Sequence, residues 1–162
     1  MGRGVALAAR GIGAPGRVFA DEMGTIRYIE HTADAGVEVA AASREELFVL
    51  GARALYQLVL DYDAVGGELE RRLELAAPNL AELFHAWLGE LLYLLDAEGL
   101  VFKKFGFDFG PGDTKLAATL WGEEVDFERH QPHGEIKNVT YADFAVEREG
   151  DGTYLARVIF DL

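Results

Sequence analysis

Residues 79–99 read NLAELFHAWLGELLYLLDAEG, and this stretch decides the fold class. Apolar residues recur through it at helical spacing and cover a face so wide that the helix must be buried at the centre of the fold. Asn79 is a suitable N-cap because Glu82 follows three residues later, and Gly99 is a typical C-terminal stop. The stretch therefore predicts one long central helix.

A second helix is predicted at residues 43–61, SREELFVLGARALYQLVLD. Ser43 and Glu46 form a capping-box pattern at its first turn. The apolar residues that follow fall on one helical face: Leu47, Leu50, Ala54, Leu55, Leu58 and Val59.

The rest of the chain is dominated by stretches typical of strands. They are TIRYIEH after Met23, VEVAA after Gly36, RLELAA, LVFKKFGFDFG, KLAATLWGE, EIKNVTYADFAVERE and TYLARVIFDL. The turn signals PGD and EGDG lie between the later ones. Together these stretches predict an α+β fold of mostly antiparallel β-sheets packed with two main α-helices.

The length of 162 residues favours one compact domain with a substantial core, which we assign to residues 23–162. Residues 1–22 carry two early arginines and a small-residue run that is too weak for a signal peptide. We interpret them as an N-terminal extension, disordered or the product of a mis-assigned start, because Met23 would itself serve as a start codon.

The formal net charge of −13 narrows the possible partners. Phosphate backbones repel so acidic a chain, so direct nucleic-acid binding is not expected, whereas divalent cations or a basic protein surface would be attracted. The chain has no cysteine, which excludes disulfides and thiolate metal sites, and a cytoplasmic location is the natural expectation. No apolar run reaches the roughly 18–20 residues that span a bilayer, so no membrane association is expected.

The polar stretch HTADAG lies between two predicted strands, and Asp34 has two interpretations there. It could accept backbone N–H bonds in an Asx-turn. Alternatively, it could be a carboxylate held at a strand end for a cation. A single aspartate does not decide between them.

The closing stretch RVIFDL is an apolar strand that ends in Asp161 and in a terminal carboxylate at Leu162. Two such carboxylates repel each other, and either is costly to bury unpaired. The strand could emerge into water and leave both of them solvated. Alternatively, they converge with Asp34 on a hard cation, for which oxygen-only ligands favour Ca²⁺ or Mg²⁺ over zinc.

The stretch HQPHGEIKNVTYADF contains a third group of candidates. Because Pro132 separates them, His130 and His133 are predicted to lie in a loop, where histidines are more often surface residues than ligands. Lys137, in a predicted strand, is either a solvated lysine on the exposed face or a lysine placed beside carboxylates or aimed at a partner.

Familiar catalytic motifs do not accompany these candidates. The sequence contains no HExxH, GxxxxGK[ST] or GxSxG. His85, near Phe84 and Trp87 in the long predicted helix, is interpreted as structural. If the chain is an enzyme, these motifs do not indicate its mechanism.

Six stretches, taken in order, resemble the archease family: HTADAG, the EELF…A…AL helix, WLGELLYLLDAEGLVF, LWGE…D.ERH, EIKNVTY and RVIFDL. They run from about Tyr28 to Leu162. The resemblance implies a small α/β protein that assists the tRNA-splicing RNA ligase, which joins ends bearing a 3′-phosphate or 2′,3′-cyclic phosphate to a 5′-hydroxyl. It implies an activator rather than an enzyme, one that promotes guanylylation of the ligase's active-site histidine and supports repeated turnover.

The resemblance also implies site residues. The family's metal site, commonly calcium, uses the aspartate of HTAD and the aspartate near the C-terminus, which match Asp34 and Asp161. Leu162 matches the terminal residue that can add an oxygen, and the lysine of the family's IKAVTYH stretch matches Lys137. Where that stretch ends in histidine, this chain has Ala142. Any ligase contact made by that histidine is missing here, whereas cation binding should survive because both aspartates remain.

Two other functions stay open beside the activator. An independent metal-dependent hydrolase could use Asp34, Asp161 and His31 to activate water, and it would show turnover by the isolated protein. A chaperone-like binding module could use the wide apolar face of the long helix. That face is more simply explained as core packed against the sheets.

Overall fold

The computed structural model describes residues 17–20, 24–30 and 33–162. The chain divides into two compact units. The first unit comprises Met1–Ala54 and Gly134–Leu162, and the second comprises Leu55–His133. Among the described residues, no helix combines the length and apolar character needed to cross a membrane.

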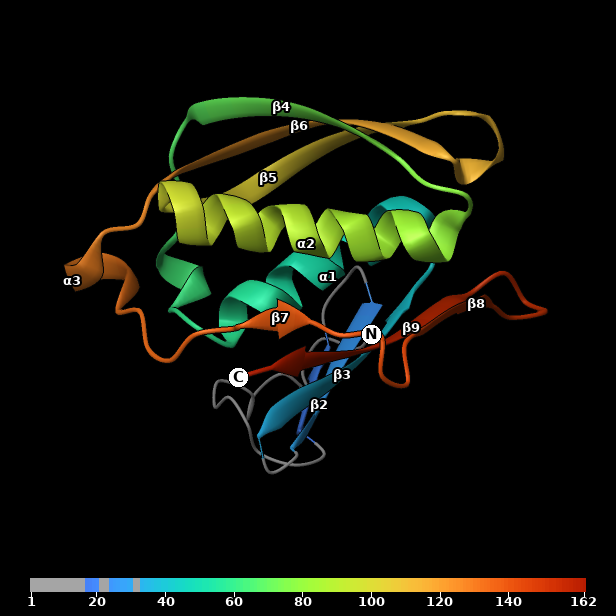
Figure 1. The fold of residues 1–162 in the computed structure, drawn as a ribbon, viewed down its shortest axis with the longest axis horizontal. Helices are drawn as coiled ribbons and strands as arrows, with labels where there is room; N and C mark the ends of the chain where they lie inside the picture. Colours follow the sequence, from blue (N-terminus) through green and yellow to red (C-terminus); the bar gives the residue numbers. More distant parts are fainter. Residues whose placement is uncertain (1–16, 21–23, 31–32) are drawn as a thin grey trace. The chain divides into compact units, whose positions relative to one another are not determined.

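The first unit contains a six-stranded antiparallel sheet (Figure 1). Its strands are β1 (Arg17–Ala20), β2 (Gly24–Glu30), β3 (Asp34–Ala41), β7 (Asn138–Val139), β8 (Ala145–Arg148) and β9 (Tyr154–Asp161). The strand order is β1-β2-β3-β9-β7, and β8 also pairs with β9. The first predicted strand is thus β2, and the last is β9. The sheet places the start of β3 beside the end of β9.

One face of this sheet is core and the other is open. Ala35 lies opposite Phe160, and Val37 lies opposite Val158, and all four side chains are buried. Because side chains alternate along a strand, the residues between them point to the opposite face. This alternation decides which side chains of β3 and β9 reach solvent.

Helix α1 (Arg44–Gln57) follows β3. The predicted capping box forms in part: the Glu46 N–H donates to Ser43 Oγ at 3.1 Å, and Glu46 Oε1 accepts from the Ala42 N–H at 3.1 Å. The Tyr28 hydroxyl donates to the Ala54 carbonyl at 3.0 Å, which ties this helix to β2. The helix ends four residues earlier than the pattern of residues 43–61 predicts.

The second unit contains a three-stranded antiparallel sheet, in the order β4-β6-β5, and the long helix α2 along one of its faces (Figure 1). The elements are β4 (Leu69–Ala76), α2 (Leu80–Glu98), β5 (Leu100–Phe109), β6 (Lys115–Glu124) and α3 (Phe127–His130), with short 3₁₀ turns at Tyr62–Ala64 and Pro111–Asp113. On the sheet side, the Trp87 ring meets the rings of Phe105 and Phe107 edge-on.

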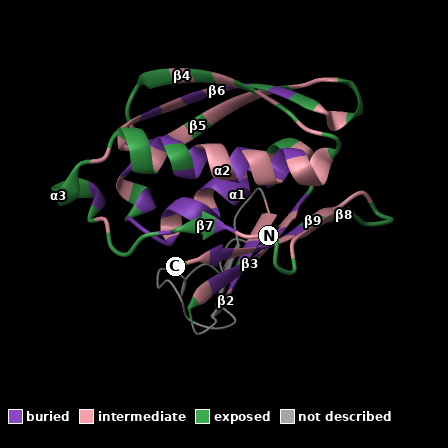
Figure 2. Cartoon of the chain, in the orientation of Figure 1, coloured by how far each residue is buried: buried purple, intermediate pink, exposed green. Residues whose placement is uncertain are grey.

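Both predicted ends of α2 are confirmed. Asn79 Oδ1 accepts from the Glu82 N–H at 2.9 Å. Gly99 adopts the left-handed conformation, with φ 66°, and its N–H donates to the Leu95 carbonyl at 3.0 Å. The wide apolar face is buried, as Figure 2 shows, and consists of Leu83, Phe84, Trp87, Leu88, Leu91, Leu92 and Leu94.

The predicted α+β class with mostly antiparallel sheets is confirmed, and two local predictions are corrected. The stretch EIKNVTYADFAVERE is not one strand, because a turn with Asp143 at φ 53° separates β7 from β8. A short third helix, α3, forms in the segment after β6. Within the predicted N-terminal extension, Arg17–Ala20 form β1 and pair with β2. Residues 1–16 and 21–23 lie outside the described part of the chain.

Candidate functional site

Two of the predicted metal ligands lie directly opposite each other. Asp34 begins β3, Asp161 ends β9, and the two residues are partners in the antiparallel register. Directly opposed residues share one face of a sheet, with Cβ atoms roughly 4.5–5.5 Å apart. The next pair along, Ala35 and Phe160, is buried, so the two carboxylates point to the open face. Both aspartates are half-buried.

A third oxygen donor, which the sequence analysis did not single out, joins this pair. Asn138 in β7 is the partner of Asp161 on the other side of β9. The following pair, Val139 and Phe160, is buried, so the Asn138 side chain shares the open face with Asp161. Sequence spacing cannot reveal this, because the sheet register brings together residues that are far apart in the chain. A signal was present in Asn138 itself, a polar residue that interrupts the apolar pattern of IKNV.

Lys137 and Leu162 are also at this strand end. The backbone N–H of Lys137 donates to the Asp161 carbonyl at 2.7 Å, and the N–H of Leu162 donates to the Ala33 carbonyl at 3.2 Å. The Lys137 side chain is exposed and lies just before β7 rather than inside a strand. The structure therefore brings all four predicted site residues together at one edge of the first unit.

The electrostatics of this strand end favour a cation. Like charges directly opposite each other in a sheet are destabilising. Within the part of the chain that the structure describes, neither Asp34 nor Asp161 makes an ion pair, and neither does the ammonium group of Lys137. An incoming divalent cation would neutralise both carboxylates at once.

The donor chemistry fits a hard cation. No group of three or more His, Cys, Asp or Glu residues suited to a metal occurs among the described residues. A cation held here would therefore need further oxygens from other groups, and the nearest candidates are the Asn138 amide and Leu162. Carboxylate, amide and carbonyl oxygens, completed by water, are the donors that Ca²⁺ accepts.

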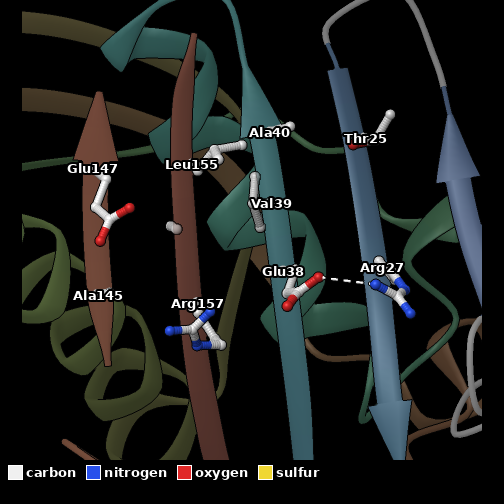
Figure 3. Close-up of a pocket in the computed structure, with 10 residues that line it drawn as sticks. Thr25, Arg27, Glu38, Val39, Ala40, Ala145, Glu147, Leu155 and Arg157 are labelled. Carbon is white, nitrogen blue, oxygen red and sulfur yellow. Dashed lines mark hydrogen bonds and ion pairs between the residues drawn. The ribbon is translucent and has the colours of Figure 1, made fainter. Parts of the chain in front are cut away.

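The open face of the same sheet also contains a shallow hollow of about 180 Å³ (Figure 3). Its charged groups largely neutralise one another. Figure 3 shows Glu38 turned toward Arg27, with 3.2 Å between oxygen and nitrogen, while Arg157 Nε lies 3.2 Å from the Asp143 carboxylate. Glu147 is the remaining carboxylate of the lining, which contains no serine or histidine. Among the described residues, the lining therefore provides no serine–histidine pair.

A second group of charged residues lies in the second unit, and here every charge is paired. Glu123 Oε2 accepts from the Gly66 N–H and from His130 Nε2, each at 2.8 Å, and Oε1 accepts from Arg129 at 2.8 Å. These hydrogen bonds, with that of Arg129 the strongest, lower the pKa of Glu123 to about 2. The carboxylate therefore stays ionised at any physiological pH.

This network also corrects the prediction for His130, which is fully buried and belongs to α3 rather than to a surface loop. The Asp126 N–H donates to Nδ1 at 2.8 Å, so the proton of a neutral ring must be on Nε2, facing Glu123. The pattern D.ERH contained the signal, since Asp126 caps the helix that delivers the histidine. His130 is a structural residue.

The remaining residues singled out from the sequence are His133, His85, Ala142 and His31. His133 is exposed, as predicted. His85 lies half-buried in α2, which agrees with a structural role. Ala142 lies in the exposed turn between β7 and β8, and its N–H donates to Thr140 Oγ1 at 3.2 Å. His31, the additional residue of the hydrolase hypothesis, lies outside the described residues.

The fold and the strand-end geometry define a class: a small antiparallel α+β protein whose strand ends gather oxygen donors on the open face of a sheet. The sequence profile of the archease protein family (MTH1598/TM1083) matches residues 26–162. The chain belongs to the archease family.

Individual relatives agree with this assignment. A protein called archease from Methanopyrus kandleri is 40% identical over 136 residues, which cover 83% of this chain and 96% of the relative. The archease of Pyrococcus furiosus is 36% identical over 137 residues, with the same coverage of both chains.

Two solved structures share the fold. The solution structure of Methanobacterium thermoautotrophicum protein 1598 matches with a TM-score of 0.70 and 33% identity, covering 85% of this chain and 98% of the other. The crystal structure of a Thermotoga maritima archease, described as a possible chaperone, matches with a TM-score of 0.58. At 23% identity, covering 83% of this chain and 94% of that one, it supports the fold alone.

Proposed function

We propose that this protein is a non-enzymatic, metal-binding activator of the tRNA-splicing RNA ligase and that it acts in the cytoplasm. In this proposal it promotes guanylylation of the ligase's active-site histidine and supports multiple turnover. The observation that carries the proposal is the direct opposition of Asp34 and Asp161, two carboxylates without an ion pair among the described residues. Membership of the archease family supports it.

In this proposal, Asp34 and Asp161 hold the cation, and Asn138 and Leu162 contribute further oxygens. Calcium fits best because it accepts six to eight oxygen ligands at varied angles, whereas Mg²⁺ demands near-ideal octahedral geometry. When bound, the cation supplies positive charge that cancels the repulsion between the carboxylates. The protein's own residues then keep the ends of β3, β9 and β7 in register.

Lys137 is the proposed contact to the ligase. Its ammonium group is exposed and makes no ion pair within the described residues, while its backbone is held by the Asp161 carbonyl at 2.7 Å. A lysine fixed at its backbone and free at its tip is suited to meet a phosphate or a carboxylate of a partner. RNA would be held by the ligase, since this chain has a net charge of −13.

The apolar face of α2 does not favour the chaperone-like alternative, because its residues are buried in the fold. A hydrolase would need a base or nucleophile beside the aspartates. Turnover of phosphoester substrates by the isolated protein would support that alternative instead.

The test is ligase guanylylation under multiple-turnover conditions, with and without this protein. We expect stimulation by the native chain and its loss with Asp34→Ala, with Asp161→Ala and after deletion of residues 161–162. Glu147→Gln is the matched control, since it removes an exposed carboxylate elsewhere on the same sheet. Unchanged stimulation by the aspartate variants, with their folds intact by circular dichroism, would refute the metal-site proposal.

A further inference from the structure

Phe127 is the most exposed large apolar side chain among the described residues, with 77% of its surface accessible. The next most exposed are Tyr141 at 59% and Tyr93 at 57%, and both carry a hydroxyl that water can solvate. A phenylalanine has no polar group, so leaving it in water forgoes the favourable free energy of burying its ring.

Hydrogen bonds hold the backbone of α3 at both ends, so the exposed Phe127 ring is attached to a well-supported helix. Asp126 Oδ1 accepts from the N–H groups of Glu128 and Arg129 at 3.0 and 3.1 Å, which caps α3. At the other end of α3, the buried His130 accepts at its carbonyl from the Asp61 N–H at 2.7 Å. Exposed aromatic side chains on a rigid support are typical anchors of protein–protein interfaces.

The charges around Phe127 are predominantly negative. Glu124, Asp126 and Glu128 are all exposed. The single cation of this segment, Arg129, already lies 2.8 Å from a Glu123 oxygen and 3.5 Å from an Asp126 oxygen. We call these three acidic residues around Phe127 the acidic collar. An apolar ring surrounded by acidic residues is complementary to an apolar pocket with a basic rim.

We propose that Phe127 is a docking anchor that inserts into an apolar pocket rimmed by lysine or arginine on the RNA ligase. This inference rests on the proposed function. An enzyme that holds RNA presents a basic surface to its phosphates, and the acidic collar is steered toward such a surface. Phe127 supplies the buried contact, and Glu124 and Glu128 supply the steering.

The test measures binding of this protein to immobilised, purified ligase at a fixed salt concentration of about 0.15 M. We expect Phe127→Ala to raise the dissociation constant about thirty-fold, the effect of losing a hot-spot residue. Tyr93→Ala, which removes an exposed aromatic ring from α2 in the same unit, should change it less than two-fold. Because Phe127 is exposed, the Phe127→Ala variant should have the same unfolding temperature as the native protein. Differential scanning calorimetry checks this.

A second arm tests the collar. The double substitution Glu124→Gln and Glu128→Gln should slow association about ten-fold and weaken its dependence on salt, with little change in dissociation. Glu147→Gln is its control.

The outcomes separate the two proposals. Native binding together with a Phe127→Ala constant within two-fold of native overturns the anchor and leaves the activator proposal standing. Loss of binding with Phe127→Ala but not with Tyr93→Ala supports the anchor. A native chain that neither binds the ligase nor stimulates its guanylylation overturns the activator proposal and this inference with it.

Discussion

Two strand ends of this protein gather ionisable side chains, and they differ in how those side chains are paired. Near the end of β6, Glu123 receives three donors, from Gly66, Arg129 and His130. Where β3 starts beside the end of β9, Asp34 faces Asp161, and neither carboxylate has an ion pair within the described residues. The first cluster is paired within the chain, whereas the second has two like charges that no described residue neutralises.

The difference suggests a division of roles in which the Glu123 cluster stabilises the fold and the Asp34–Asp161 pair is the proposed binding site. A carboxylate whose two oxygens both accept hydrogen bonds from the chain stabilises the native state and has little capacity left for a ligand. Two opposed carboxylates without a counter-charge destabilise the apo fold, so they gain most from a cation. The following experiments test this contrast.

The largest effect is expected from His130→Ala. The substitution removes a fully buried ring, leaves the Asp126 N–H without its acceptor and removes one of the two hydrogen bonds to Glu123 Oε2. We expect the free energy of unfolding, measured by urea denaturation, to fall by about 3 kcal/mol. His133→Ala, at an exposed histidine, should cost less than about 0.5 kcal/mol. Similar values for the two variants would contradict a structural network.

Calcium should stabilise the native protein through the other cluster. At a free concentration 100 times the dissociation constant, a cation that binds only the folded state adds about 2.7 kcal/mol. Asp161→Asn should abolish this increase in thermal unfolding experiments, whereas His130→Ala should retain it from a lower starting stability. A calcium response that survives Asp161→Asn would place the cation elsewhere.

Acid should weaken the Glu123 network in a defined window. The pKa of Glu123 is lowered from 4.5 to about 2 in the folded state, so its contribution is complete above pH 4.5 and is lost as the pH falls toward 2. With 20% of the side chain exposed, we expect this contribution to be about 2 kcal/mol. Glu123→Gln should be less stable than the native protein at pH 7, and the two unfolding free energies should converge near pH 2. A constant difference across that range would show that ionisation of Glu123 is not involved.

The smallest effect has the opposite sign. In the presence of a chelator, Asp161→Asn should raise the free energy of unfolding by about 0.5 kcal/mol, because it relieves repulsion across the β3–β9 pair. Urea denaturation with EDTA at low ionic strength measures this difference. Destabilisation by this isosteric change would mean that Asp161 has a stabilising partner, and the contrast between the two clusters would disappear.

Local chemistry explains why much of the fold could be predicted. Asn79 and Gly99 define the ends of α2 through hydrogen bonds within a few residues of each, so the sequence contains the whole interaction. The resemblance implied that Asp34 and Asp161 belong to one metal site, and the register places them opposite each other. The break between β7 and β8 was missed, because the turn at Asp143 interrupts a stretch whose composition suits a continuous strand.

The sequence by itself determined the alternation of apolar and polar residues along the strands, the helix caps and the negative net charge. Each of these depends on neighbouring residues or on the whole composition. Only the tertiary structure decided that His130 is buried beside Glu123 and that Asn138 joins Asp161. Both depend on sheet register and on packing between segments far apart in the chain. The sequence does not show whether a distant donor forms a hydrogen bond with a given polar residue. The pairing of polar residues is therefore a property of the fold, and so is the difference between a structural cluster and a binding site.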